Sequence, residues 1–283
     1  MLLTDLAGKL ERTEGLDPVV DAVTKVVNRV LPEGVVKDAL HGKWLGHQLH
    51  PMLVAMPIGM FSSATLLDLT GGSPEAARRL VGAGVLTVAP TAAAGFADWS
   101  ELGDFRRPRR VGLLHAAYNV TSTLLFAASW KARGNGNQAR GKALALAGLA
   151  ALGGGGYLGG HLSYSQGVGV NRNADRAAEP AEWTDAAAAA EIRDGQLRRV
   201  DVEGQPVLLT RQGDRLLAIG AVCSHYGGPL EEGELNGSCV VCPLHGSEFE
   251  LGDGSVVRGP ATVPQQAYDV RTVGDRIEVK ARI

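Results

Sequence analysis

The sequence predicts an α+β protein of two domains, an N-terminal four-helix transmembrane bundle followed by a small antiparallel β domain. Four stretches contain no Asp, Glu, Lys or Arg, and each is long enough for a spanning helix, which needs about 20 mainly apolar residues. In the C-terminal part, short apolar runs are broken by Gly-Asp turns, which is typical of β-hairpins. The charge-free stretches are residues 44–67, 80–97, 111–130 and 143–171.

The placement of charge favours membrane spans. Charged residues gather in the short connections between the four stretches, as a membrane hairpin bundle requires. The stretches are richer in Ala, Gly and Thr than in Leu and Ile, so a soluble four-helix bundle is the alternative. We expect an amphipathic helical region at residues 1–43, the membrane domain at 44–165, a polar linker at 166–181 and the β domain at 182–283.

The N-terminal region predicts an amphipathic helix over residues 16–30, with Asp17 as its N-cap and Pro18 in its first turn. Such a helix either packs against the rest of the protein or lies on the membrane surface. Its apolar face consists of Leu16, Val19, Val20, Val23, Val26, Val27 and Val30.

Two Cys/His pairs in the β domain predict a metal centre. Cys223 and His225 form a Cys-x-His pair, and Cys242 and His245 form a Cys-x-x-His pair, with sixteen residues between the two pairs. Zinc sites with two thiolates and two imidazoles usually place the cysteines in one arm and the histidines in the other. Here each arm contains one of each, which favours a 2Fe-2S cluster with both Cys on one iron and both His on the other. Zinc is the alternative.

The rest of the β domain is arranged around these pairs. Hairpins are predicted at 205–220 and 268–283, with further short strands at 197–202 and 238–243, and the two ligand loops at one tip. Gly227, Gly228 and Gly246 let backbone N–H groups approach the sulfurs and take conformations that side chains forbid.

With these motifs the chain resembles the Rieske family from near Trp183 to the C-terminus. Respiratory members add a disulfide at positions occupied here by Gly228 and Leu244, so the chain is similar to the ferredoxin-type branch, which implies a lower reduction potential. Ser247 matches the family serine that hydrogen-bonds a cluster sulfur and raises the potential. The resemblance also implies that Pro260 stiffens a third loop over the cluster.

The membrane domain carries a second resemblance. Residues 40–165 resemble a family of predicted four-span membrane proteins of unknown function, whose mark is a His-x-x-His-Pro entry into the first span. Here that entry is His47, His50 and Pro51. Proline at a first helical position fixes the start of the span and places His50 at a membrane boundary.

Antiparallel spans would bring four histidines, His47, His50, His115 and His161, to one side of the membrane. They are either interfacial hydrogen-bonding residues or a site for haem b, quinone or a metal, and for a haem we expect His115 and His161 as ligands. The glycines at 153–160 serve close helix packing or make room for a flat ligand.

Composition limits the partners and the location. A net charge of −2 and a pI near 6.4, without a basic stripe, exclude nucleic acid as a partner. Three cysteines form no disulfide framework, and no cleavable signal is recognised at the start. Eight Lys and Arg flank the spans on the side of the β domain and six on the other. We therefore expect a multi-pass protein of the cell membrane with a cytoplasmic β domain.

Together these features predict a membrane-anchored iron-sulfur protein that carries single electrons through the His-bound iron. Its expected partners are the lipid bilayer and a redox partner protein or quinone, and no substrate conversion is required of it. The alternative is a membrane oxidoreductase that passes electrons between quinol or haem b in the bundle and the cluster. A Rieske oxygenase is excluded, because it needs a mononuclear iron held by two His and a carboxylate and no histidine follows His245.

Overall fold

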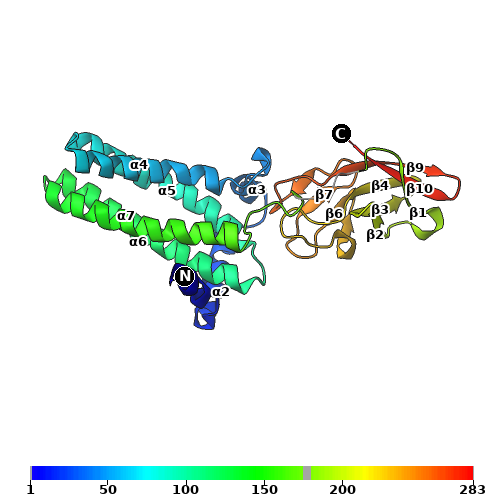
Figure 1. Cartoon of the computed structure of the whole chain (residues 1–283), viewed down its shortest axis with the longest axis horizontal. Helices are drawn as coiled ribbons and strands as arrows, with labels where there is room; N and C mark the ends of the chain where they lie inside the picture. Colours follow the sequence, from blue (N-terminus) through cyan, green and yellow to red (C-terminus); the bar gives the residue numbers. More distant parts are fainter. Residues whose placement is uncertain (1, 175–179, 283) are drawn as a thin grey trace. The chain divides into compact units, whose positions relative to one another are not determined.

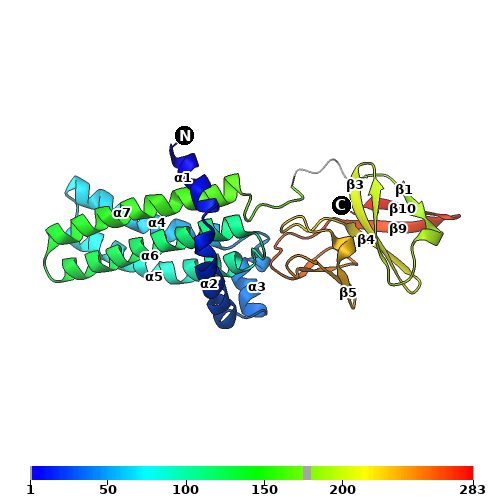
Figure 2. The same ribbon diagram turned by 90° about the horizontal axis from the view of Figure 1, so that it is seen from below.

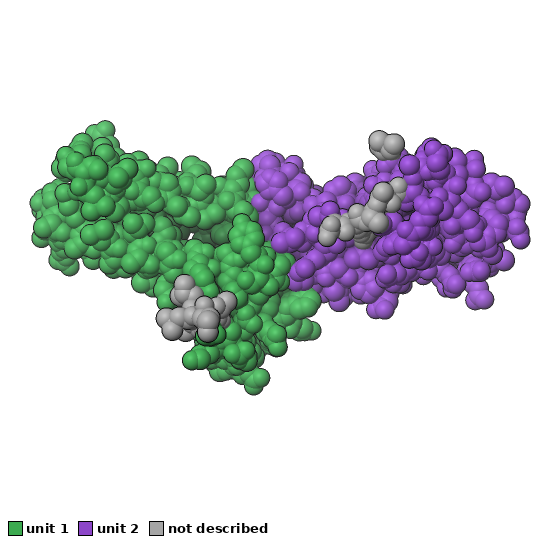
Figure 3. Space-filling view, viewed as in Figure 1, with its two compact units in different colours: residues 1–32, 49–168 green, residues 33–48, 169–283 purple. Residues whose placement is uncertain are grey.

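The computed structural model describes residues 2–174 and 180–282. The chain divides into two compact units, one of residues 1–32 and 49–168 and the other of residues 33–48 and 169–283 (Figure 3). The sequence groups residues 33–43 with the N-terminal helices, whereas in the structure residues 33–48 pack with the β unit. Of the expected linker at 166–181, residues 175–179 lie outside the described part of the chain.

Four long helices form the bundle of the first unit (Figure 1). Helices consecutive in sequence pack side by side, and the first also contacts the last, so the four close into a ring. All four are long and apolar enough to cross a membrane, with mean hydropathies between 1.3 and 1.6. They are α4 (His50–Thr70), α5 (Pro74–Ser100), α6 (Arg106–Gly134) and α7 (Gln138–Gly160), the last continued by the π-helical turn η3 (His161–Ser165).

Local signals set the ends of these helices. Gly71, with φ of +74°, ends α4 in the left-handed conformation that glycine accepts without strain. Ser73 caps α5, because its Oγ accepts the N–H of Ala76 at 3.2 Å. Asn137 caps α7 in the same way. The connections between helices are therefore short and specified by adjacent residues.

The core of the bundle is built from two stacked phenylalanines surrounded by small residues. The rings of Phe61 in α4 and Phe126 in α6 lie 3.8 Å apart between centroids and are nearly parallel. A Cβ on Gly84 would lie 2.5 Å from Phe61, and one on Gly148 would lie 3.0 Å from Phe126. The Ala- and Gly-rich composition thus allows close helix packing, as is common in membrane bundles.

A buried ion pair ties the C-terminal ends of α4 and α6. Both guanidinium Nη atoms of Arg133 contact the carboxylate of Asp68, one of them at 2.9 Å, and Arg133 Nε also donates to Ser129 Oγ at 3.1 Å. Both charged side chains are almost completely buried. Burial of this kind requires pairing, because an isolated charge in an apolar interior is strongly unfavourable.

Three N-terminal elements run across the opposite end of the bundle (Figure 2): α1 (Leu2–Glu11), η1 (Glu14–Leu16) and α2 (Asp17–Val30). The Asp17 carboxylate accepts two hydrogen bonds of 2.6 Å from Arg110 of α6, and Asp21 accepts one of 2.6 Å from Arg106. The expectation that Asp17 is an N-cap is wrong, because Leu16 is the N-cap and makes no side-chain cap. The Asp17 carboxylate binds the bundle instead.

The apolar side of α2 is divided between two environments. Val20 and Val27 are buried against the bundle, so α2 packs on the protein, the first of its two expected arrangements. Three further valines, Val19, Val26 and Val30, remain exposed.

Two antiparallel sheets make up the second unit (Figure 1). The larger sheet has the strand order β1-β10-β9-β4-β3-β2 and the smaller has the order β5-β6-β7-β8. The larger contains β1 (Thr184–Ala188), β2 (Leu197–Val202), β3 (Gln205–Gln212), β4 (Arg215–Gly220), β9 (Ala267–Val273) and β10 (Arg276–Ala281). The smaller contains β5 (Glu234–Asn236), β6 (Cys239–Val241), β7 (Glu248–Glu250) and β8 (Val256–Arg258).

The two predicted hairpins are confirmed. Gln212 pairs with Arg215 and Val273 pairs with Arg276, which leaves the two Gly-Asp dipeptides as two-residue turns. The unit also contains short helical elements: α3 (Val35–His41), η2 (Lys43–Leu45), η4 (Ala189–Glu191) and η5 (Leu230–Glu232).

A hydrophobic cluster between the sheets supports the predicted metal site. It includes Leu208 and Ile219 from the larger sheet and Phe249 from the smaller one, all fully buried. Cys223 and Cys242 belong to the same cluster. The cysteine ends of both ligand loops are therefore anchored in the core of the β unit.

Candidate metal centre

The two predicted ligand pairs lie on loops that share one backbone turn. In the β4–β5 loop the C=O of Cys223 accepts the N–H of Gly227 at 2.9 Å, and in the β6–β7 loop the C=O of Cys242 accepts the N–H of Gly246 at 3.0 Å. In both loops the cysteine N–H donates to the carbonyl five residues later at 2.8 Å. Both glycines have φ in the left-handed region, +74° and +72°, which confirms the predicted need for glycine.

The turn that both loops share places the two histidines beside each other and the two cysteines beside each other. The imidazole rings of His225 and His245 lie 5.0 Å apart between centroids and are nearly perpendicular. The thiols of Cys223 and Cys242 hydrogen-bond each other. The structure thus gathers all four residues as a sulfur pair beside an imidazole pair.

The electrostatics suit metal binding by neutral imidazole and by thiolate. Burial, and to a smaller extent the nearby His245, lower the pKa of His225 to about 3, so the ring is neutral at pH 7. The hydrogen bond between the thiols raises the pKa of Cys223 and lowers that of Cys242 to about 6. A neutral imidazole and a readily ionised thiol are the forms that bind metals.

The donor set fits two irons better than one zinc ion. Nδ1 of His225 is buried and has no hydrogen-bond partner in the structure, an arrangement that is unfavourable unless a ligand occupies the site. Two imidazoles beside two thiols can give each of two irons two protein ligands.

Ser247 joins the second ligand loop to a third loop. Its side chain is fully buried, and its Oγ accepts the N–H of Ala261 at 3.0 Å. Because a hydroxyl both donates and accepts, its O–H remains able to donate elsewhere. This third loop lies between β8 and β9. Ser224 Oγ of the first ligand loop donates to the carbonyl oxygen of Val263 in the third loop at 2.6 Å. Both ligand loops are therefore bonded to the loop that contains Pro260.

Comparison with known proteins agrees with this geometry. Residues 182–270 match the family described as Rieske [2Fe-2S] domain. Ferredoxin CarAc from Metapseudomonas resinovorans is 35% identical over 89 residues, which are 31% of this chain and 83% of that protein. The chain belongs to the Rieske family. The ferredoxin subunit of anthranilate 1,2-dioxygenase from Burkholderia cepacia is 32% identical over 99 residues, which are 35% of this chain and 92% of that protein.

A solved structure and a second family complete the comparison. The ferredoxin of carbazole 1,9a-dioxygenase from Nocardioides aromaticivorans IC177 is 30% identical, with a TM-score of 0.34, over 35% of this chain and 98% of that one. Residues 46–172 match the family described as predicted membrane protein (DUF2231). The expected fusion of a membrane domain with a Rieske domain is confirmed.

A pocket of about 130 Å³ opens beside His225 in the Rieske unit. It is lined by residues from the third loop, from the segment before α4 and from the start of the expected linker: Pro260, Ala261, Thr262, Val263, His47, Gln48, Gly169, Val170, Asn171, Ser224 and His225. The backbone N–H of Arg172 donates to Ser224 O at 3.0 Å, and Asn173 Nδ2 donates to Val222 O at 2.9 Å. The start of the expected linker is therefore fixed to the first ligand loop.

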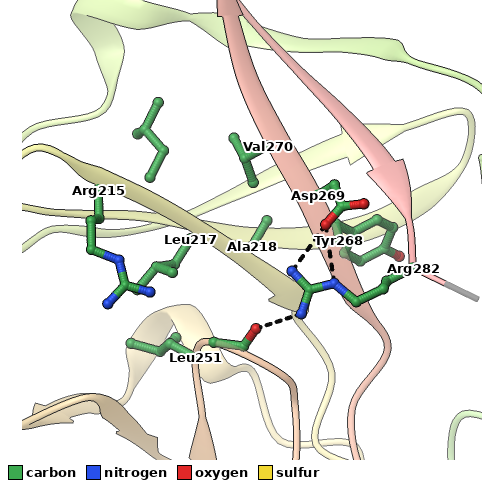
Figure 4. A pocket seen from close by; sticks show the side chains of 10 residues that line it. Arg215, Leu217, Ala218, Leu251, Tyr268, Asp269, Val270 and Arg282 are labelled. Atoms are coloured by element: carbon green, nitrogen blue, oxygen red, sulfur yellow. Dashed lines mark hydrogen bonds and ion pairs between the residues drawn. The ribbon is translucent and has the colours of Figure 1, made fainter.

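A larger hollow of about 280 Å³ lies beside β4 and β9 (Figure 4). The guanidinium of Arg282 spans it, pairing with Asp269 at 3.0 Å and donating to Gly252 O at 2.8 Å. The residues that line it include none of the four predicted ligands. We assign it to the packing of the two sheets.

The structure brings two of the predicted membrane histidines together. The rings of His50 in α4 and His115 in α6 lie 6.3 Å apart between centroids. The Nδ1 of each ring hydrogen-bonds a backbone carbonyl oxygen of another helix. His50 bonds that of Thr91 at 2.9 Å, and His115 bonds that of Gly155 at 2.8 Å. Both therefore act as hydrogen-bonding links between helices.

The other two histidines are engaged elsewhere. Nε2 of His161 lies 2.7 Å from a carboxylate oxygen of Glu11 in α1, and His47 belongs to the Rieske unit, where its Nδ1 contacts the carbonyl of Gln48. A Cβ on Gly159 would lie 3.0 Å from the His115 ring, so this glycine serves close packing of α6 on α7.

Sequence reasoning missed the residues that join segments remote from each other in the chain. Asp38 accepts the N–H of Gly259 at 3.0 Å, although the two are 221 positions apart in the chain. Glu11 contacts His161 across 150 positions. No local pattern marks such residues, because their partners depend on the tertiary fold.

Proposed function

We propose that this protein is a membrane-anchored Rieske electron carrier in which Cys223 and Cys242 hold one iron and His225 and His245 the other. The observation that carries the proposal is the repeated turn of the two ligand loops, which sets two thiols beside two imidazoles. When bound, the 2Fe-2S cluster supplies a one-electron couple.

The residues around the centre suit electron exchange with a protein partner. His225 is buried, whereas His245 is partly exposed and its neighbour Leu244 is 47% exposed. An apolar side chain beside a ligand histidine offers a contact surface through which a partner can approach. Two relatives are named as ferredoxin components of dioxygenase systems, so a partner oxidoreductase that takes single electrons is proposed here as well.

The proposal is tested on full-length protein purified from membranes. Electron paramagnetic resonance after reduction should give the low average g value of a His-ligated 2Fe-2S cluster, with two irons per chain. Cys242→Ser should lose the signal, whereas Cys239→Ser should retain it, because Cys239 Sγ contacts Glu250 and not the other thiols. Stoichiometric zinc without iron would contradict the proposal.

The alternative function places haem b or quinone near His50, His115 and His161. The contact between His50 and His115 is the observation in its favour. Against it, Nε2 of His161 already bonds Glu11, whereas the carbonyl bonds of His50 and His115 use Nδ1 and do not occupy Nε2. A Soret band in the purified protein that disappears in His115→Ala would support the alternative. Without such a band or a bound quinone, the helices are an anchor.

We also propose that the Rieske domain faces the cytoplasm. Basic residues favour that side only slightly, by eight to six. The three cysteines are buried and form no disulfide, which suits a reducing compartment.

A further inference from the structure

A segment far from the cluster motif in sequence packs on the third loop of the Rieske unit. Residues 33–48, which contain α3 and η2, belong to the same compact unit as the β-sheets. Asp38 Oδ1 accepts the N–H of Gly259 at 3.0 Å, and Lys43 Nζ donates to Val257 O at 2.5 Å. His41 is 2% exposed, and its Cδ2 would lie 3.3 Å from a Cβ on Gly259. Residues 33–48 are thus in close contact with the 257–261 turn.

The turn held by Asp38 is the one that reaches Ser247. Gly259 is followed by Pro260 and Ala261, and the N–H of Ala261 donates to Ser247 Oγ at 3.0 Å. Two hydrogen bonds on one short turn therefore connect the Asp38 carboxylate to the Ser247 hydroxyl. Accepting from Ala261 occupies one lone pair of that hydroxyl and limits the directions in which its O–H can point.

We propose that Asp38 is a positioning residue of the Rieske centre, which holds the Gly259–Ala261 turn against Ser247 and so orients the Ser247 hydroxyl. This inference rests on the function proposed above. Hydrogen bonds to the cluster sulfurs tune the reduction potential of a 2Fe-2S centre, and a donor favours the more negative, reduced form. Loss of the Asp38 contact should therefore lower the potential.

The hydrogen bond and the charge of Asp38 have opposite effects on the reduction potential, so two substitutions are needed to separate them. A negative charge held at the third loop disfavours the added electron, so removal of the Asp38 charge alone should raise the potential. Asp38→Asn removes the charge but retains an oxygen that can accept from Gly259, whereas Asp38→Ala removes both. Asp201→Ala is the matched control, because Asp201 Oδ1 accepts the N–H of Gly204 at 2.9 Å in the β2–β3 turn, outside the ligand loops.

The experiment uses the full chain in detergent, with its cluster, and two measurements. Redox titration followed by electron paramagnetic resonance should give Asp38→Asn a potential equal to or above that of the wild type, and Asp38→Ala a potential below that of Asp38→Asn. Amide hydrogen exchange in peptides spanning 256–266 should be roughly fivefold faster in Asp38→Ala, since one hydrogen bond contributes about 1 kcal/mol. Asp201→Ala should match the wild type in both.

Equal potentials and equal exchange in Asp38→Ala and Asp38→Asn would overturn the inference. Failure of Asp38→Ala alone to retain a cluster, with Asp38→Asn and Asp201→Ala loaded normally, would support it. A wild-type protein without a Rieske signal would contradict the proposed function instead, so the two failures are distinguishable.

Discussion

Two glycines allow the ligand loops to turn back on their own cysteines. Gly227 and Gly246 each stand four residues after a cysteine and donate to its carbonyl from a left-handed conformation. Other L-residues disfavour this conformation by about 1–2 kcal/mol. Gly228 has a different role, since a Cβ there would lie 2.7 Å from Cys242 Sγ. Each loop therefore needs one glycine for its conformation, and the first loop needs a second glycine for space.

Gly227→Ala should destabilise the Rieske unit by about 1–2 kcal/mol through backbone strain. Space is not the cause, because an added Cβ would have no neighbour closer than 3.9 Å. Gly227→Asn should be milder, since Asn tolerates the left-handed region. Denaturant unfolding followed by the visible absorption of the cluster measures the difference. Gly252→Ala, at a glycine without positive φ, should behave as the wild type, and equal stability of all variants would contradict the strain argument.

At the scale of elements, α2 is attached to the bundle mainly by charge. Asp17 and Asp21 pair with arginines at the start of α6, while only Val20 and Val27 of this helix are buried. An attachment of this kind depends on the ionisation of its carboxylates. Val19, Val26 and Val30 are at least half exposed and so contribute less to the packing within the chain.

Acid should therefore release α2. The hydrogen bond from Arg110 lowers the pKa of Asp17, so its ion pair stabilises docking above the unfolded-state pKa of about 3.9 and is lost as pH falls through the folded-state pKa. Limited proteolysis of residues 17–30 should accelerate below about pH 4. Asp17→Asn should be cleaved faster already at neutral pH, with a weaker acid dependence. Asp5→Asn is the control, and an unchanged acid response in Asp17→Asn would rule out this pair as the cause.

The glycine-rich face of α7 sets the approach of α6. Gly159 faces the ring of His115, whereas Gly156, less than one turn away, has nothing within 4 Å of an added Cβ. Gly159→Leu should lower the stability of the detergent-solubilised protein by about 1–3 kcal/mol, the usual penalty for overpacking. Gly156→Leu should be nearly neutral. Thermal unfolding followed by circular dichroism compares the two, and equal effects would show that this face does not set the packing.

At the scale of the whole molecule, the sequence predicted the features that depend on neighbouring residues. Four charge-free stretches predicted the long helices, and the Gly-Asp dipeptides predicted two hairpin turns. The Cys/His spacing predicted the two ligand pairs, because the Cys and the His of each pair lie within one loop. Periodicity and turn chemistry act over a few residues, so they can be read directly from the chain.

Contacts between remote segments were beyond such reasoning. The sequence placed residues 33–43 with the N-terminal helices, yet Asp38 and Lys43 bind the turn before Pro260. The sequence considered His161 only as an interfacial hydrogen-bonding residue or, with His115, as a haem ligand, and did not indicate its contact with Glu11. In each case an ordinary charged residue gains its role only from a partner 150 or more positions away.

The side of the membrane on which the Rieske domain lies can be tested with two engineered cysteines. Asp275 is exposed in the β9–β10 turn, and Asn135 is exposed between α6 and α7, on the opposite side of a four-span bundle. The native cysteines are buried, so background labelling by an impermeant maleimide should be low. In intact cells Asn135→Cys should be labelled at once and Asp275→Cys only after the membrane is permeabilised. The reverse pattern would place the Rieske domain outside the cytoplasm, and labelling of both sites in intact cells would contradict the single span, α7, between them.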